Sequence, residues 1–411
     1  MNKLRLMLYP GLKFKRWVFV IISGVILISL GVSMALNLNE LNLLRYEVIG
    51  FLLVLAGIYV VGLGIRRMII SIYDALLPDK NAELIELLYQ ERYRRKGPKI
   101  VVVGGGTGLS TMLRGIKKFT NNITAIVTVA DDGGSSGALR DELGILPPGD
   151  IRNCLVALAD TEPLMEKLFQ YRFSDGEDLK GHSFGNLFIA TMTEVLGDFD
   201  KAVKESSKVL AIKGQVLPST LEDVRLSARL KSGELIKGES QIPKVEGKIE
   251  EVFINPENSK PLPEALTALK EADAIILGPG SLYTSLLPNL LVKELSKAIK
   301  SSEALKLYIC NVMTQFGETD DYTVSDHVQT LYDHVGDDII DYVLVNNEEV
   351  DSDLLFKYAK EGAKPVEIDW DKLEELDIEV IEESLINQSD LVRHNPDKLA
   401  KVIIDLILER R

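Results

Sequence analysis

The run of residues 100–110 constrains the fold of this chain more than any other stretch of its sequence. It opens with Ile-Val-Val-Val, apolar β-branched residues that predict a buried strand. Three glycines, Thr107 and Gly108 follow, and residues 110–118 have the pattern of a helix. In such a unit the glycines let the backbone approach a phosphate, and the free N–H groups at the helix start favour an anion. The run therefore predicts a nucleotide-binding α/β domain.

The loop differs from two widespread phosphate-binding patterns. The dinucleotide fingerprint G-x-G-x-x-G needs glycine at the position of Leu109, and a P-loop needs Gly-Lys-Ser/Thr after the glycines, where none is present. An NAD-dependent oxidoreductase is therefore disfavoured, and the nature of the phosphate-bearing ligand stays open. The first candidate ligand contacts are Gly105, Gly106, Thr107 and Gly108.

A second polar loop follows the next predicted strand, residues 123–129. It contains Asp131 and Asp132, followed by Ser135 and Ser136. In Rossmann folds an acidic residue at this point binds a ribose hydroxyl. Two adjacent aspartates can instead hold a divalent cation such as Mg²⁺ beside phosphate oxygens, or cap a turn. We expect all four side chains near a ligand, with the role of the aspartates left open.

Further polar loops begin helices or follow strands later in the chain. Because the carboxyl ends of parallel strands meet at one edge of a sheet, these loops are expected to share one cleft. Asp150 is expected to cap the helix that runs through residues 154–159, and His182 has no partner spacing for catalysis. The remaining candidate ligand contacts are Asn153, Asn186, Gly278, Gly280, Ser281 and Tyr283.

The predicted fold class is α/β, a Rossmann-like, doubly wound and mostly parallel sheet over residues 99–411. A small β insert is expected at about 214–254, because strand patterns flank the turn residues 231–233, Lys-Ser-Gly. Residues 71–98 precede this domain and have an amphipathic pattern that ends in a basic segment. They predict a linker helix, whose cations contact either solvent or anionic lipid.

Two apolar, uncharged segments near the N-terminus predict a membrane hairpin. Residues 17–36 and 48–65 are each close to the roughly 20 residues that a helix needs to span a bilayer. Cations flank the outer ends at 13–16 and 66–67, whereas the connector 37–47 carries one arginine against two glutamates. The positive-inside rule then places both ends in the cytoplasm. A cleavable signal peptide is the weaker alternative, since a second span follows closely.

Residues 1–70 are thus predicted to anchor the chain in the cell membrane, with the main domain cytoplasmic and the lipid bilayer as a partner. Neither span contains an ionisable residue, which argues against a transport pathway. The net charge of −14 argues against a nucleic-acid binder. The two cysteines, Cys154 and Cys310, lie far apart in sequence and predict buried thiols in a reducing compartment.

The ordered motifs between residues 99 and 411 resemble the family of bacterial gluconeogenesis factors, which is related to 2-phospho-L-lactate transferase. The motifs that carry the resemblance lie at 104–110, 131–137, 147–153, 181–187, 278–285, 311–315 and 393–395. The resemblance implies a protein that binds a nucleotide sugar such as UDP-N-acetylglucosamine. It also implies a requirement for cell shape and wall synthesis on gluconeogenic carbon. The loop with Thr107 would hold the diphosphate, and the loop 278–285 would complete the site.

The resemblance favours a UDP-sugar-binding regulator over an enzyme, because no nucleophile–base pair stands out. The alternative is a Mg²⁺-dependent transferase of phosphorus-containing groups, in which Asp131 and Asp132 would hold the metal. No cofactor is assigned apart from Mg²⁺ in this alternative. Cell-wall synthesis proteins are the expected partners, and a homo-oligomer stays open. The membrane hairpin departs from the soluble members of the family and suits a regulator placed beside membrane machinery.

Overall fold

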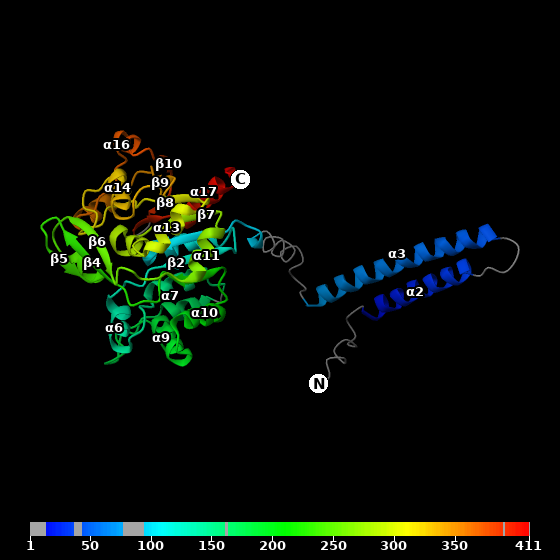
Figure 1. Ribbon diagram of the computed structural model, residues 1–411. Coiled ribbons are helices and arrows are strands. Elements are labelled where there is room, and N and C mark those ends of the chain that lie inside the picture. Colours follow the sequence, from blue (N-terminus) through cyan, green and yellow to red (C-terminus); the bar gives the residue numbers. More distant parts are fainter. Residues whose placement is uncertain (1–13, 37–42, 77–93, 161–162, 389–390, 411) are drawn as a thin grey trace. The chain divides into compact units, whose positions relative to one another are not determined.

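The computed structural model describes residues 14–36, 43–76, 94–160, 163–388 and 391–410 (Figure 1). These residues form two compact units, Met1–Glu91 and Arg92–Arg411. Most of the predicted linker, residues 71–98, lies outside the described residues; its first part, 71–76, continues a helix of the first unit.

The first unit is a pair of packed helices, α2 (Phe14–Leu36) and α3 (Leu43–Leu76). They contain segments long and apolar enough to cross a membrane, Arg16–Ala35 and Val48–Ile69. Glycines let the two backbones approach closely: a Cβ on Gly57 would lie 2.8 Å from the carbonyl oxygen of Gly24. The outer faces carry large exposed apolar side chains, as a helix needs in contact with lipid.

The second unit is built on a seven-stranded sheet in which all neighbouring strands are parallel. Its order is β10-β9-β8-β7-β1-β2-β3, which is a doubly wound arrangement and confirms the predicted fold class. The strands are β1 (Ile100–Gly104), β2 (Ile123–Val127), β3 (Gln215–Pro218), β7 (Ala274–Leu277), β8 (Leu305–Ile309), β9 (Tyr342–Asn346) and β10 (Glu379–Glu383).

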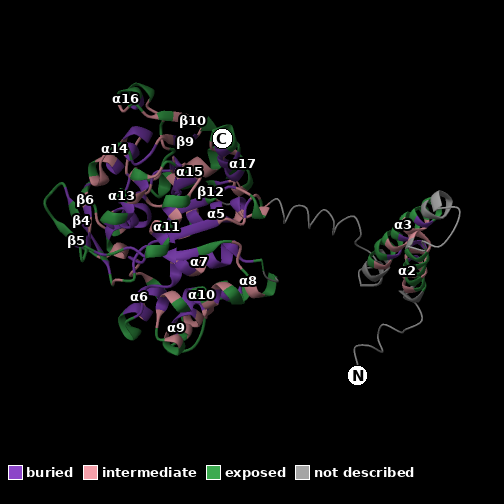
Figure 2. Ribbon diagram, turned by 45° about the vertical axis from the view of Figure 1, so that its right-hand side comes forward, coloured by how far each residue is buried: buried purple, intermediate pink, exposed green. Residues whose placement is uncertain are grey.

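Helices cover both sides of this sheet, as Figure 2 shows. The first half contributes α5 (Gly106–Ile116), α6 (Gly134–Leu143), α7 (Gly149–Leu158), α8 (Pro163–Gln170), α9 (Phe184–Leu196) and α10 (Phe199–Val209). The second half contributes α11 (Pro263–Glu271), the π-helical turn η2 (Leu282–Leu286), α12 (Leu287–Leu290), α13 (Lys293–Ser301), α14 (Val324–Val335), α15 (Ser352–Lys360), α16 (Trp370–Glu375) and α17 (Pro396–Glu409). A short hairpin joins β11 (Ile386–Gln388) and β12 (Val392–His394).

The predicted β insert is a three-stranded antiparallel sheet, β4 (Arg225–Leu230), β5 (Leu235–Lys237) and β6 (Ile249–Asn255), with the 3-10 turn η1 (Glu239–Lys244) between β5 and β6. Its predicted start at residue 214 is wrong. Residues 215–218 form β3 at the edge of the main sheet, where Val216 and Leu217 are buried and pair with β2. A four-residue strand carries too little pattern to be assigned to one sheet from sequence alone.

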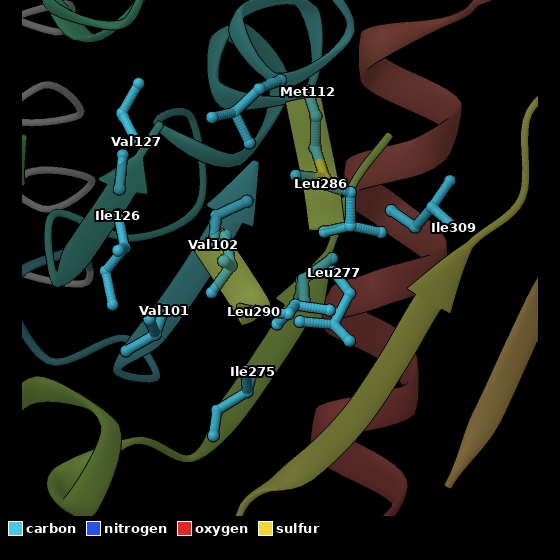
Figure 3. Packing of buried hydrophobic residues seen from close by; sticks show 14 of the residues in the cluster. Val101, Val102, Met112, Ile126, Val127, Ile275, Leu277, Leu286, Leu290 and Ile309 are labelled. Atoms are coloured by element: carbon cyan, nitrogen blue, oxygen red, sulfur yellow. The ribbon is translucent and has the colours of Figure 1, made fainter. Parts of the chain in front are cut away.

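The core lies around β1, whose residues 100–104 are all buried between β2 and β7. Figure 3 shows Val102, Ile126 and Leu277 from these three adjacent strands among its side chains. Leu109 is fully buried in the same cluster. The leucine that breaks the dinucleotide fingerprint is therefore a core residue that packs α5 onto the sheet.

Candidate functional site

The strand order reverses between β1 and β7, which are direct neighbours in the sheet. Chain connections leave such a switch point in opposite directions, and a crevice opens at the carboxyl ends of the two strands. The glycine segment 105–108, which is Gly105 and the first turn of α5, follows β1, and the loop 278–281 follows β7. The two glycine-rich loops predicted from the sequence therefore lie side by side at the place where ligands bind in this fold.

Backbone contact joins the two loops. A Cβ on Gly108 would lie 2.6 Å from the carbonyl oxygen of Pro279, and a Cβ on Gly280 would lie 3.3 Å from that of Gly105. Gly106 has a φ of +67°, a conformation that side chains of L-residues rarely adopt. Glycine at these positions is thus required by close approach and by backbone conformation.

The first turn of α5 leaves backbone N–H groups without a side-chain cap at its N-cap residue, Gly105. One of these groups, the N–H of Gly106, donates to the buried carboxylate of Asp150. The prediction that Asp150 caps its own helix is wrong: α7 begins at Gly149 with Pro148 as its N-cap, and Asp150 lies in the first turn. Burial, followed by the charge of Asp131, raises the pKa of Asp150 to about 6.

A cavity of about 260 Å³ opens beside the two loops. Its wall comes from five segments that are distant in sequence. The lining residues are Gly106, Thr107, Gly108, Thr111, Pro279, Gly280, Ser281, Ser285, Asn311, Val312, Met313, Thr314, Gln315, Tyr358, Val392, Arg393 and His394. Gln315 ties two of these loops together, because its Nε2 donates to Ser281 Oγ at 3.0 Å.

The cavity wall carries one cationic side chain among the described residues, the exposed guanidinium of Arg393. His394 beside it is buried, and burial lowers its pKa to about 4, so its ring is neutral at pH 7. Backbone amides, hydroxyl groups and one guanidinium form a donor set suited to an anionic ligand.

Five of the predicted contacts line this cavity: Gly106, Thr107, Gly108, Gly280 and Ser281. Gly105 and Gly278 belong to the same two glycine segments but are not among the residues that line the cavity. The structure places Tyr283 away from the wall, in the core, with its hydroxyl oxygen 2.6 Å from that of Tyr322. Burial raises the pKa of Tyr283.

The other predicted contacts gather at the N-terminal ends of α6, α7 and α9. Asn186 Nδ2 donates to Ser135 Oγ at 3.1 Å, and the same hydroxyl oxygen lies 3.1 Å from His182 Nδ1. Asn153 Oδ1 accepts from Arg152 at 2.7 Å, and Ser136 is buried against Gly149. The predicted contacts therefore do not share a single cleft but form two polar groups. The group made by the glycine loops lines the cavity.

The two predicted metal ligands are engaged by the backbone. Asp131 Oδ1 accepts from the N–H of Gly133 and Asp132 Oδ1 from that of Ser240, each at 2.8 Å. Within the part of the chain that the structure describes, no group of three or more His, Cys, Asp or Glu is arranged to hold a metal ion.

Two glutamates near these aspartates were not predicted as site residues. Burial raises the pKa of Glu239 to about 8, with the charges of Asp131, Asp132, Asp150 and Glu318 adding to the shift. Burial raises the pKa of Glu318 to about 7, and its Oε1 accepts from Thr284 Oγ1 at 3.1 Å. Glu239 comes from the β insert, so only tertiary structure brings it to the loop after β2.

Known proteins match this chain over its α/β domain and beyond. The family model of 2-phospho-L-lactate transferase CofD matches residues 100–386. A putative gluconeogenesis factor of Clostridium acetobutylicum is 47% identical over 413 aligned residues, which cover 98% of this chain and 91% of the relative. The gluconeogenesis factor of Bacillus subtilis is 52% identical over 313 residues, 76% of this chain and 99% of the relative.

A solved structure, protein BH3568 from Bacillus halodurans, is 53% identical and superposes with a TM-score of 0.74. It covers 75% of this chain and 100% of its own. Some relatives therefore match nearly the whole of this chain, whereas others match about three quarters of it. By these matches and by its doubly wound sheet with two glycine-rich loops at the switch point, the chain belongs to the gluconeogenesis-factor family, within the wider family of 2-phospho-L-lactate transferase.

Proposed function

We propose that this chain is a membrane-anchored regulator that binds a nucleotide sugar of the UDP-N-acetylglucosamine type. The proposal rests on the contact between the two glycine loops at the switch point of the sheet. Their backbones approach within contact distance at Gly108 and Pro279, and both line one cavity with Arg393. Adjacent backbone amides on a helix N-terminus and a guanidinium suit the two phosphates of a nucleoside diphosphate.

Binding without turnover is supported by the chemistry of the cavity wall. His394 has a pKa of about 4 and its ring bonds to the backbone of Cys310, so it is a weak general base. In the described cavity wall, no hydrogen bond joins a serine or threonine hydroxyl to this ring, and both cysteines are buried. A nucleophile activated by an adjacent base, as covalent catalysis needs, is therefore lacking among these residues.

The N-terminal hairpin supports a position at the membrane. Its two candidate spans, Arg16–Ala35 and Val48–Ile69, are 20 and 22 residues long and predominantly apolar, and their exposed faces include Phe19 and Phe51. Cations flank the outer ends, which favours both termini and the α/β domain in the cytoplasm. We propose that the anchor holds a nucleotide-sugar sensor beside wall-synthesis proteins, where it maintains cell shape on gluconeogenic carbon.

Calorimetric titration of the full-length chain in detergent micelles tests the ligand. UDP-N-acetylglucosamine, NAD and GTP are each titrated with and without Mg²⁺, and the ligand is analysed afterwards for turnover. The proposal predicts saturable binding of UDP-N-acetylglucosamine alone, independent of Mg²⁺ and without product. Binding of NAD or GTP in its place would reject the nucleotide-sugar assignment.

A transferase is the second candidate, favoured by the match to the 2-phospho-L-lactate transferase model. It would need a group that stabilises the transferred charge. Asp131 and Asp132 are both bonded to backbone N–H groups, so no step is assigned to a metal held by them. Consumption of GTP with a phosphorylated hydroxy acid and Mg²⁺ in the same samples would support this candidate and reject the regulator.

A further inference from the structure

Asn289 connects the residue before the first glycine segment to the helical turn after the second. It is fully buried in α12, directly after the π-helical turn η2. Its Nδ2 donates to the carbonyl oxygens of Gly104, at 3.1 Å, and of Ser285, at 2.8 Å. Gly104 is the last residue of β1, directly before the first glycine segment, and Ser285 lines the cavity, so one side-chain amide links the end of β1 to the cavity wall.

The surroundings of Asn289 are unfavourable for an amide. Its neighbours along the chain, Leu286, Leu287 and Leu290, are all buried, and Figure 3 shows Leu286 and Leu290 within the apolar core. The Oδ1 atom of Asn289 is itself buried without a hydrogen-bond partner. A buried polar atom without a partner costs about 1–3 kcal/mol. An asparagine at this position therefore serves the two hydrogen bonds of Nδ2 rather than core packing.

We propose that Asn289 is a positioning residue that fixes the spacing of the two glycine loops and thereby preorganises the anion-binding cavity. The proposal rests on the proposed function, since it concerns the same cavity. Holding Ser285 in place matters because its Oγ lies only 3.4 Å from the position of a Cβ on Gly106. If the two carbonyls separate, the donors of the two loops no longer converge on one ligand, and affinity falls.

Two variants test this role in the full-length chain, each with the same number and branching of side-chain heavy atoms as asparagine. Asn289→Leu removes both hydrogen bonds, and Asn289→Asp turns a carboxylate oxygen toward both carbonyls. Thr120→Val is the matched control: Thr120 is also fully buried and donates to the carbonyl of Pro98 at 2.9 Å, but it lies outside the cavity wall. We expect at least tenfold weaker binding of UDP-N-acetylglucosamine in both Asn289 variants, and wild-type affinity in the control.

Hydrogen exchange by mass spectrometry separates positioning from general stability. Faster exchange in peptides covering 104–108 and 281–286, at an unchanged rate in β9, is expected for Asn289→Leu. Wild-type affinity or wild-type exchange in both loops would overturn the inference. If Asn289→Leu does not fold, the same two measurements on Asn289→Asp decide. A wild-type chain that does not bind the nucleotide sugar would reject the proposed function alone, and loop exchange would then decide the role of Asn289.

Discussion

The backbone of Gly108 faces the carbonyl of Pro279 so closely that a Cβ on Gly108 would lie 2.6 Å from its oxygen. The loop after β1 and the loop after β7 therefore fit together only without a side chain at residue 108. Because both loops line the cavity, this contact links the packing of the switch point to the ligand site.

Gly108→Ala should separate the two loops, because the atoms nearest to its Cβ are backbone atoms of Pro279 and Gly280, which cannot rotate away. We expect a loss of stability of about 1–3 kcal/mol, as for other overpacked sites, and at least tenfold weaker binding of the nucleotide sugar. Gly104→Ala is the control, since the nearest atom to its Cβ is Leu109 Cδ1 at 3.7 Å. Thermal unfolding and calorimetry measure both effects; equal behaviour of the two variants would refute the close-approach argument.

Thr107→Ala should weaken ligand binding with little effect on stability. Thr107 is exposed on the cavity wall, so its hydroxyl is free to bond a phosphate and contributes little to packing. A lost hydrogen bond to a charged group predicts about tenfold weaker affinity. Thr267→Ala, on an exposed face of α11 outside this cavity, should leave affinity unchanged. Calorimetric titration that gives Thr107→Ala the wild-type affinity would remove Thr107 from the site.

Glu239→Gln should reduce the pH dependence of stability: the free energy of unfolding should decrease less with rising pH than it does in the wild type. The folded pKa of Glu239, about 8, is raised above its ordinary value of 4.5. The folded chain then keeps a proton that the unfolded chain releases, so this contribution is full below pH 4.5 and is lost as pH rises to 8. Glutamine carries no such proton. A difference of about 1 kcal/mol shifts the Tm of a domain of this size by roughly 2–4 °C.

Thermal unfolding at pH 5 and pH 8.5 measures this effect. The Tm of the variant should decrease less between pH 5 and pH 8.5 than the Tm of the wild type. Some decrease of Tm should remain in the variant, because the pKa values of Glu318 and Asp150 are also raised. An equal slope in both proteins would show that Glu239 is ionised throughout the range.

Gly57→Leu should force α2 and α3 apart, because its Cβ would lie 2.5 Å from Ile28 Cγ1 and 2.8 Å from the carbonyl oxygen of Gly24. Gly62→Leu is the control, since no atom lies within 4 Å of its Cβ. Spin labels at the exposed positions Phe19 and Tyr59 report the distance between the helices. We expect a longer, broader distance distribution for Gly57→Leu alone; an unchanged distribution would contradict the tight helix contact.

Most of the fold could be predicted from local pattern. The strand at β1, the glycine loop and the hairpin of the β insert each have short-range signals, and the structure contains all three. The strand ends predicted one shared cleft, whereas only five of the predicted contacts line the cavity. Leu109 appeared in the sequence only as a departure from a fingerprint, whereas the structure shows it as a core residue.

The parts that could not be predicted depend on tertiary contacts. Tyr283 follows a glycine loop like a ligand contact, but the π-helical turn that begins at Leu282 turns it into the core. Asp150 has the pattern of a cap, and only the packing of α7 beside α5 shows which helix receives its carboxylate. Glu239 enters through the β insert, and no local pattern links it to the aspartates after β2.

The most direct test of nucleotide-sugar binding in this cavity compares wild type and Arg393→Gln by titration with UDP-N-acetylglucosamine. Arg393 is exposed on the wall, so its replacement should leave the fold intact. The account predicts saturable binding at one site per chain in the wild type, at least tenfold weaker binding in the variant, and equal Tm values. Absence of binding in the folded wild type, or equal affinity in the two proteins, would contradict it.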